Sequence, residues 1–145
     1  MKIRKAKKED LKEIAKIFRE ESAKKPYNTK YSSASAFKDV SEYFKDDLYV
    51  AIDENEIIGF IASHIISSDK KKAYTDEIWI KYNWQGKGAG KMLVKFIEDM
   101  YKKKGLSGMR LTTRKKAKAY GFYKKLKYGM RILFIWRRNY EIPNF

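Results

Sequence analysis

Cysteine is absent from this chain of 145 residues, and histidine occurs once, at His64. The absence of cysteine excludes a disulfide framework and a thiol nucleophile. With one histidine and no cysteine, the sequence offers no set of the side chains that usually bind zinc. We therefore expect no metal site.

Long hydrophobic runs are also missing. The longest apolar stretch, around residues 57–66, is interrupted by Gly59, Ser63 and His64. It falls short of the roughly 20 residues that a membrane-spanning helix needs. The N-terminal segment MKIRKAKKED turns acidic where an export signal would turn apolar. We expect a cytoplasmic protein without a membrane partner.

Negative charge is scarce, because 18 Asp and Glu face 34 Lys and Arg, for a net charge of +16. Such a charge fits a nucleic-acid-binding surface, attraction of an anionic cofactor or substrate, or the Lys-rich surface of a thermophilic protein. The single glutamine and the spread of lysines along the whole chain favour the thermophilic surface. Aromatic residues do not alternate with the lysine runs as a base-stacking surface requires, which disfavours a nucleic-acid partner without excluding it.

Hydrophobic residues make up 43% of the chain, enough for the core of a folded domain. No linker, repeat or low-complexity segment divides the sequence, so we expect a single domain over residues 1–145. Apolar periodicity and turn residues predict the elements. In chain order these are a strand over 1–5, helices over 9–21 and 34–44, a hairpin of 48–52 and 57–66, a strand over 74–80, a helix over 89–104, a strand over 109–113, a helix over 115–126 and a final strand over 131–136. The order β-α-α-β-β-β-α-β-α-β predicts an α+β fold with a sheet of mixed direction.

The segment QGKGAG, residues 85–90, lies between an expected strand and an expected helix. Glycine lets the backbone come close to a ligand, and N–H groups at a helix N-terminus attract anions. A P-loop would need Gly at position 85 and Ser or Thr at position 92, and a dinucleotide fingerprint would need Gly at position 91 or 93. The segment therefore favours a phosphate-bearing cofactor of another class, although a plain glycine turn has the same composition.

Two motifs resemble those of the GNAT N-acyltransferases. Gln85, Gly88 and Gly90 match the family's Gln/Arg-x-x-Gly-x-Gly/Ala diphosphate loop. The segment 119–128 (AYGFYKKLKY) is similar to the family's Ala-x-x-Leu/Phe-Tyr-x-x-x-Gly-Phe pattern. The expected element order is also that of the family, so the resemblance spans nearly the whole chain and implies the GNAT fold.

Three positions depart from the family pattern. Tyr82 stands where a proline is frequent, and Lys127 replaces a glycine. Lys116 stands where many members carry an asparagine that contacts the cofactor. Lys116 and Lys127 lend some support to a GNAT module that binds coenzyme A without turnover.

The resemblance implies acetyl-coenzyme A as co-substrate. In the family, the loop's backbone amides bind the diphosphate, and the exposed backbone of the preceding strand holds the pantetheine arm. The N–H of Ile80 is the candidate oxyanion donor. The cofactor-binding residues expected on this basis are Ile78, Ile80, Gln85, Gly86, Lys87, Gly88, Ala89, Gly90, Lys91 and Lys116.

Tyr123 lies where the family places its general acid. A phenol with a pKa of about 10 keeps its proton at neutral pH and can pass it to a thiolate whose conjugate pKa is about 8.5. Packing is the competing interpretation, because Tyr120, Phe122 and Tyr128 could form an aromatic face with it.

Glu77 is the candidate general base, acting through a water molecule. It lies on the strand before the loop, where many relatives carry an acid, and side-chain alternation sends its neighbour Asp76 to the opposite face. A solvent-exposed carboxylate at a strand edge is the alternative for Glu77. His64, on an alternating apolar strand, is more typical of a sheet residue than of a base.

The resemblance implies an acetyl-CoA-dependent N-acetyltransferase that acetylates a primary amine by direct transfer. A peptide or protein amine is the first expectation for the acceptor, and a small-molecule amine is the second. A basic nucleic-acid-binding domain and a non-catalytic coenzyme A-binding GNAT module are the alternatives. The final strand, with Arg137 and Arg138 at its end, could pair with a second copy, so a homodimer stays open.

Overall fold

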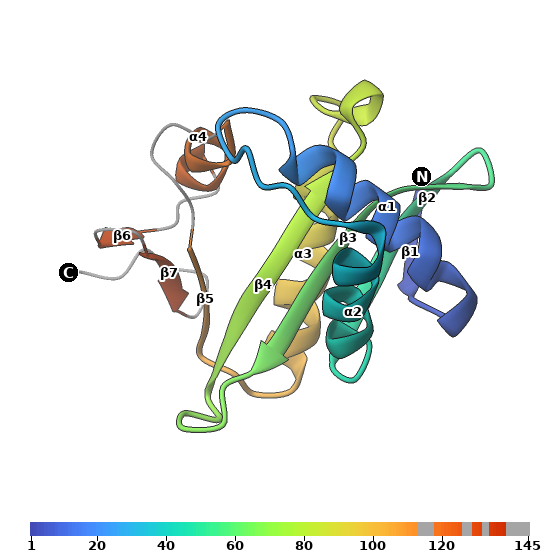
Figure 1. Cartoon of the computed structure of the whole chain (residues 1–145). Coiled ribbons are helices and arrows are strands. Elements are labelled where there is room, and N and C mark those ends of the chain that lie inside the picture. Colours follow the sequence, from blue (N-terminus) through green and yellow to red (C-terminus); the bar gives the residue numbers. More distant parts are fainter. Residues whose placement is uncertain (113–117, 126–128, 132–133, 139–145) are drawn as a thin grey trace. The chain divides into compact units, whose positions relative to one another are not determined.

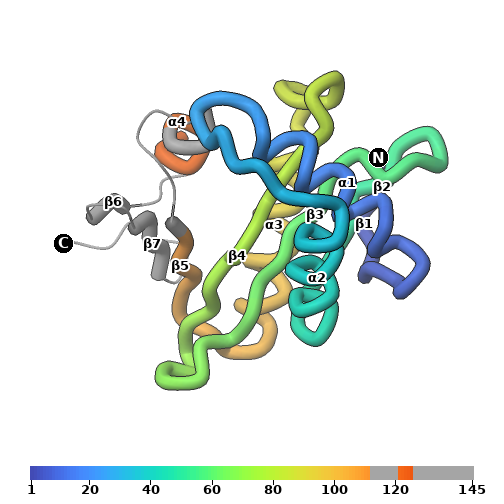
Figure 2. Tube along the Cα trace, in the orientation of Figure 1, coloured from blue at the N-terminus to red at the C-terminus, as the bar shows by residue number. Residues whose placement is uncertain are grey.

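The structure, a computed structural model, describes residues 1–112, 118–125, 129–131 and 134–138 (Figures 1 and 2). Contacts between residues divide the chain into two compact units. The first comprises Met1–Ser63 and Glu77–Phe96, and the second comprises His64–Asp76 and Ile97–Phe145. Two strands and one helix run from one unit into the other.

The elements follow the predicted order of a mixed α/β fold, which confirms the fold class. In chain order they are β1 (Lys2–Lys5), the 3-10 helix η1 (Lys8–Asp10), α1 (Leu11–Ser22), α2 (Ser33–Tyr43), β2 (Asp47–Asp53), β3 (Glu56–Ile65), β4 (Lys72–Ile80), the 3-10 helix η2 (Tyr82–Trp84), α3 (Ala89–Lys103), β5 (Gly108–Thr112), α4 (Lys118–Lys125), β6 (Gly129–Arg131) and β7 (Phe134–Arg138). Boundaries differ from the predicted ones by up to three residues.

The prediction of one final strand over 131–136 was wrong. The chain forms two short antiparallel strands there, β6 and β7, with Gly129 opposite Trp136 and Arg131 opposite Phe134. The sequence between Arg131 and Phe134 contains none of the Gly, Pro, Asn or Asp residues that mark a hairpin. The division into β6 and β7 therefore has no local sequence signal.

In the first unit, β1, β2 and β3 pair in order and antiparallel. The β2–β3 turn puts Glu54 at φ 50° and Asn55 at φ 62°, the left-handed values of the two-residue turn that matches strand twist. Helices α1 and α2 lie on one face of these strands (Figure 1).

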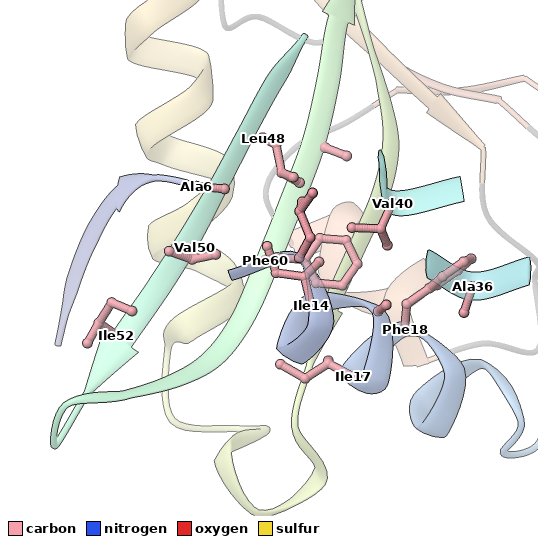
Figure 3. Packing of buried hydrophobic residues seen from close by; sticks show 13 residues of the cluster. Ala6, Ile14, Ile17, Phe18, Ala36, Val40, Leu48, Val50, Ile52 and Phe60 are labelled. Atoms are coloured by element: carbon pink, nitrogen blue, oxygen red, sulfur yellow. The ribbon is translucent and has the colours of Figure 1, made fainter. Parts of the chain in front are cut away.

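The core of this unit lies between those helices and the sheet (Figure 3). Its apolar residues recur at helical spacing in α1 and at alternate positions in β2, because each element buries a single face there. The members are Ala6, Leu11, Ile14, Ala15, Ile17, Phe18, Ala36, Val40, Leu48, Val50, Ile52, Phe60 and Ala62. All four residues predicted for the inner face of α1 (Leu11, Ile14, Ala15 and Phe18) are among them.

The first part of α3 packs on the other face of the same strands. Tyr49 alternates with the core residues of β2, and its ring centroid lies 4.9 Å from that of Phe96. Strand β4 enters the first unit beside β3, where Lys81 N–H donates to Ile58 O at 2.8 Å. A Cβ on Gly59 would lie 2.5 Å from Ile80 Cδ1 and 2.9 Å from Trp79 O. Glycine therefore permits the close approach of β3 and β4 at the end of β4.

In the second unit, β4 pairs parallel with β5 from Lys72 opposite Gly108 to Thr75 opposite Leu111. Strand β5 pairs antiparallel with β7. Helix α3 ends before Gly105, which adopts φ +85°, the left-handed conformation common after helices. No helix in the described ranges is long and apolar enough to span a membrane.

Candidate functional site

The glycine loop has an open, left-handed backbone. Gly86 adopts φ +76° and Gly88 adopts φ +91°, which other residues adopt only with strain. A Cβ at either position would have no atom of the described part of the chain within 4 Å. The backbone conformation therefore requires these glycines, and the space outside them is free for a ligand.

The loop leads directly into the N-terminus of α3. The helix ladder starts with Met92 N–H, which donates to Gly88 O at 3.0 Å. The N–H groups of Ala89, Gly90 and Lys91 come before that bond and have no acceptor within the helix. The helix dipole adds about half a positive charge at this end. Together these groups suit an anion such as a diphosphate.

Two lysines, Lys87 and Lys91, belong to this segment. The side chains of Lys87 and Lys91 are exposed, and Lys87 Nζ lies 5.2 Å from the centre of the Trp84 ring. Both cations can add to the field of the loop without being part of the core. Lys116 and the rest of the run over 113–117 lie outside the described residues.

The Gln85 side chain ties the loop to the rest of the first unit. Its Nε2 donates to Ile80 O at 2.9 Å and to Glu21 Oε1 at 3.2 Å. Glu21, only 7% exposed, also accepts from Lys24 Nζ at 2.9 Å. Glu21 was not predicted as a site residue, although it lies three residues after Phe18 and so on the buried side of α1. The amide of Gln85 thus holds the end of β4 against α1.

The end of β4 is also fixed by Lys81. Its ammonium group contacts Glu56 Oε1 at 2.7 Å and Glu13 Oε1 at 2.9 Å. Burial would lower the pKa of Lys81, but these two hydrogen-bonded carboxylates raise it above its usual value. The lysine therefore keeps its charge and links α1, β3 and β4.

The backbone N–H and C=O groups of Ile80 point away from β3. Lys81 N–H donates to β3, and in a strand successive backbone groups point to alternate edges. The carbonyl of Ile80 is bound by Gln85, so that edge of Ile80 is the one beside the loop. This orientation is the one that an oxyanion donor at the N–H of Ile80 requires. Ile78 shares the same edge by alternation.

Glu77 and Asp76 have different partners, as alternation predicts. Glu77 Oε2 accepts from Trp79 Nε1 at 3.4 Å, and Trp79 packs against the core that includes α1. Asp76 Oδ2 lies 2.7 Å from His64 Nδ1, in the second unit. His64 is therefore bound to a carboxylate in its own sheet, and Glu77 lies on the face of β4 that carries α1.

Aromatic side chains surround the region of Glu77. Trp79 lies 4.8 Å from Tyr27 and 6.2 Å from Phe18, and Phe18 lies 4.6 Å from Tyr31, between ring centroids. Burial, together with the nearby carboxylates of Glu77 and Asp39, raises the pKa of Tyr31. Tyr31 therefore keeps its proton at neutral pH. No local sequence pattern predicts this cluster, because its members come together only in the tertiary structure.

Tyr123 lies on α4 in the second unit and is 2% exposed. Its ring packs edge-on against Phe122, with the centroids 5.0 Å apart. The side chain therefore belongs to the packed interior of its unit, in line with the packing interpretation. The catalytic interpretation for Tyr123 stays a prediction.

A sequence model of the acetyltransferase (GNAT) family matches residues 10–128. The chain belongs to this family. The match contains every candidate site residue, from Glu77 through the glycine loop to Tyr123. No curated protein matches the chain in sequence.

Solved GNAT acetyltransferase structures share the fold. PaiA N-acetyltransferase from Thermoplasma acidophilum, in complex with coenzyme A, is 24% identical, with a TM-score of 0.73 and coverage of 94% of this chain and 98% of that one. Ard1 from Thermoplasma volcanium is 17% identical, with a TM-score of 0.76 and coverage of 99% and 98%. The ribosomal-protein-S18-alanine N-acetyltransferase from Escherichia coli is 16% identical, with a TM-score of 0.72 and coverage of 99% and 96%. At these identities the likeness establishes the GNAT fold over almost the whole length of each chain.

Proposed function

We propose that this GNAT acetyltransferase transfers an acetyl group from acetyl-coenzyme A to a primary amine of a peptide or protein. The observation that carries the proposal is the open glycine loop at the start of α3, anchored through Gln85 to the carbonyl of Ile80. A diphosphate bound by the loop would leave the thioester arm beside the strand that presents Ile78 and Ile80. That arrangement supports coenzyme A as the co-substrate.

The loop would bind the co-substrate chiefly through its backbone. The N–H groups of residues 85–90 would bind the diphosphate, Lys87 and Lys91 would add charge, and Lys116 is a further candidate for the phosphates. The N–H of Ile80 would donate to the thioester oxygen as it gains negative charge, which is typically the largest catalytic contribution.

In direct transfer, the amine nitrogen forms the new C–N bond and the C–S bond of the thioester breaks. The proton leaving the amine would pass through water to Glu77, and the departing thiolate would take a proton from Tyr123. A protein N-terminus, with a pKa of about 8, needs only a weak base such as a carboxylate. This suits Glu77.

Two proteins of the same fold support the choice of a peptide amine: the ribosomal-protein-alanine N-acetyltransferase of Brucella melitensis and the ribosomal-protein-S18-alanine N-acetyltransferase of Escherichia coli. A small-molecule amine is the second candidate. The carboxylates of Glu77 and Asp39 both raise the pKa of Tyr31. Their negative charge would favour a small cationic amine near Tyr31 despite the basic surface.

The test is acetyl-coenzyme A incubated with the purified protein and a panel of peptides and small amines, with products identified by mass spectrometry. We expect acetylated peptide and free coenzyme A in equal amounts. Coenzyme A binding without transfer to any amine would instead support the non-catalytic module. Calorimetry with duplex DNA is the parallel control, and tight DNA binding without coenzyme A binding would overturn the proposal.

A further inference from the structure

The first unit carries a depression that the proposed reaction does not use. Its volume is about 490 Å³, and it is formed by the C-terminal half of α1 and the loop that follows. The lining residues are Arg19, Glu20, Ala23, Lys24, Lys30 and Tyr31. Three of the six carry positive charge.

The charges of this depression are unevenly paired. Lys24 is balanced by the buried Glu21 at 2.9 Å. Arg19 and Lys30 form no ion pair in the part of the chain that the structure describes, and Glu20 forms none either. Two cations without a partner against one carboxylate leave a net attraction for an anion at a concave surface.

A row of aromatic side chains joins this depression to the candidate base. Tyr31 lines the depression, its ring packs on Phe18, and Phe18 lies near Trp79, whose Nε1 donates to Glu77. All of these residues belong to the first unit. Phe18 is buried, so the row gives the separation of the two places and not a surface that a peptide would follow. An extended peptide advances about 3.5 Å per residue, so a peptide of a few residues covers that separation with its amine at Glu77.

We propose that the depression binds a carboxylate of the acceptor, so that the acceptor is a peptide amine with an acidic side chain a few residues away. A peptide with Asp or Glu shortly after its free N-terminus has this chemistry. The inference rests on the proposed function, because it takes Glu77 as the place of the acceptor amine. It adds a functional reason for part of the positive charge, whereas composition alone favours a thermophilic surface.

The test uses two peptides that differ only in charge, Ala-Gly-Glu-Glu-Gly-Gly amide and Ala-Gly-Gln-Gln-Gly-Gly amide. Their affinities are measured by calorimetry on the coenzyme A-bound protein at low salt, and their kcat/KM values with acetyl-coenzyme A. We expect the wild type to prefer the acidic peptide by about tenfold, the effect of two partly exposed charge pairs. The double variant Arg19→Gln, Lys30→Gln should lose this preference and keep its affinity for the neutral peptide.

Lys12→Gln is the matched control, because Lys12 is an exposed lysine on α1 outside the depression. Combined with Lys16→Gln, another exposed lysine of α1 outside the depression, it removes as many positive charges as the double variant and should keep the preference. Equal binding of both peptides by the wild type, no binding of the acidic peptide, or a preference retained in the double variant would each overturn the inference.

The two proposals fail separately. Preferential binding of the acidic peptide that Arg19→Gln, Lys30→Gln abolishes, with no acetyl transfer, would keep the carboxylate site and reject the transferase function. Acetylation of both peptides at equal kcat/KM would do the reverse. The affinity for coenzyme A and the thermal midpoint of each variant show that the fold is intact.

Discussion

The hydrophobic core beneath α1 and the glycine loop before α3 belong to one unit but are determined in opposite ways. The core depends on side chains that fill space, such as Ile14 and Phe60, both 0% exposed. The loop depends on side chains that are missing, at Gly86 and Gly88, with open space around them. A substitution in the core should therefore change stability, and a substitution in the loop should change ligand binding.

The largest expected effect is on the core side of this comparison. Ile14→Ala removes a fully buried side chain and should lower the free energy of unfolding by about 2–5 kcal/mol. Urea unfolding measures the loss, and calorimetry should find the coenzyme A affinity of the folded protein unchanged. A weakened affinity at full folding would mean that core and loop are not separable.

Tyr123→Phe tests proton donation by a residue that lies outside both the core beneath α1 and the glycine loop. The hydroxyl group of a general acid typically contributes 10²-fold or more to the rate, so kcat should fall by about 100-fold while the affinity for acetyl-coenzyme A stays the same. Steady-state kinetics over a range of pH provide the measurement. Unchanged turnover at every pH would remove Tyr123 from the mechanism and leave it a packing residue.

Glu77→Gln should lower kcat/KM by about tenfold at pH 7, because only about a tenth of an amine with a pKa near 8 is neutral at that pH. The deficit should shrink above pH 9, because an amine with a pKa near 8 is then already neutral and needs no base. Asp76→Asn is the matched control, since Asp76 is bound to His64 rather than to the Trp79 side of β4. Equal losses in both variants would contradict a specific role for Glu77.

The smallest effect concerns pH and the start of α1. The Arg4 guanidinium, 2.7 Å from Asp10, and the N–H of Lys7 hold the pKa of Asp10 below its usual value. A lowered pKa in the folded state stabilises the fold above the ordinary pKa of about 4, and this contribution disappears as the pH falls towards the folded value. Asp10→Asn should cost about 1–2 kcal/mol at pH 7, and the gap to wild type should narrow at pH 3 in urea unfolding. A gap independent of pH would contradict the pairing.

The sequence predicted the features that depend on local patterns and missed those that depend on contacts between distant residues. The buried face of α1 was predictable because helical spacing is a local pattern, and the glycine loop was predictable because its motif is contiguous. The Gln85–Glu21 hydrogen bond joins residues 64 apart in the chain, and no local sequence pattern predicts it. The cluster of Tyr27, Tyr31 and Trp79 was missed for the same reason.

The final hairpin shows a different limit. The chain between β6 and β7 has neither glycine nor proline, so the sequence suggests one continuous strand where pairing produces two. The antiparallel partner of β7 on its other side is β5. Only the pairing of the sheet as a whole separates β6 from β7.

The central claim is that the backbone of the glycine loop binds the diphosphate of coenzyme A. The direct test compares coenzyme A with pantetheine, which lacks the diphosphate, by calorimetry on wild type, Gly88→Ala and Gly105→Ala. Both glycines adopt left-handed φ with open space around them, so each alanine should cost about 1 kcal/mol of stability. We predict that Gly88→Ala weakens coenzyme A binding at least tenfold and leaves pantetheine binding unchanged, whereas Gly105→Ala weakens neither. Equal coenzyme A affinity in Gly88→Ala and Gly105→Ala would contradict the account.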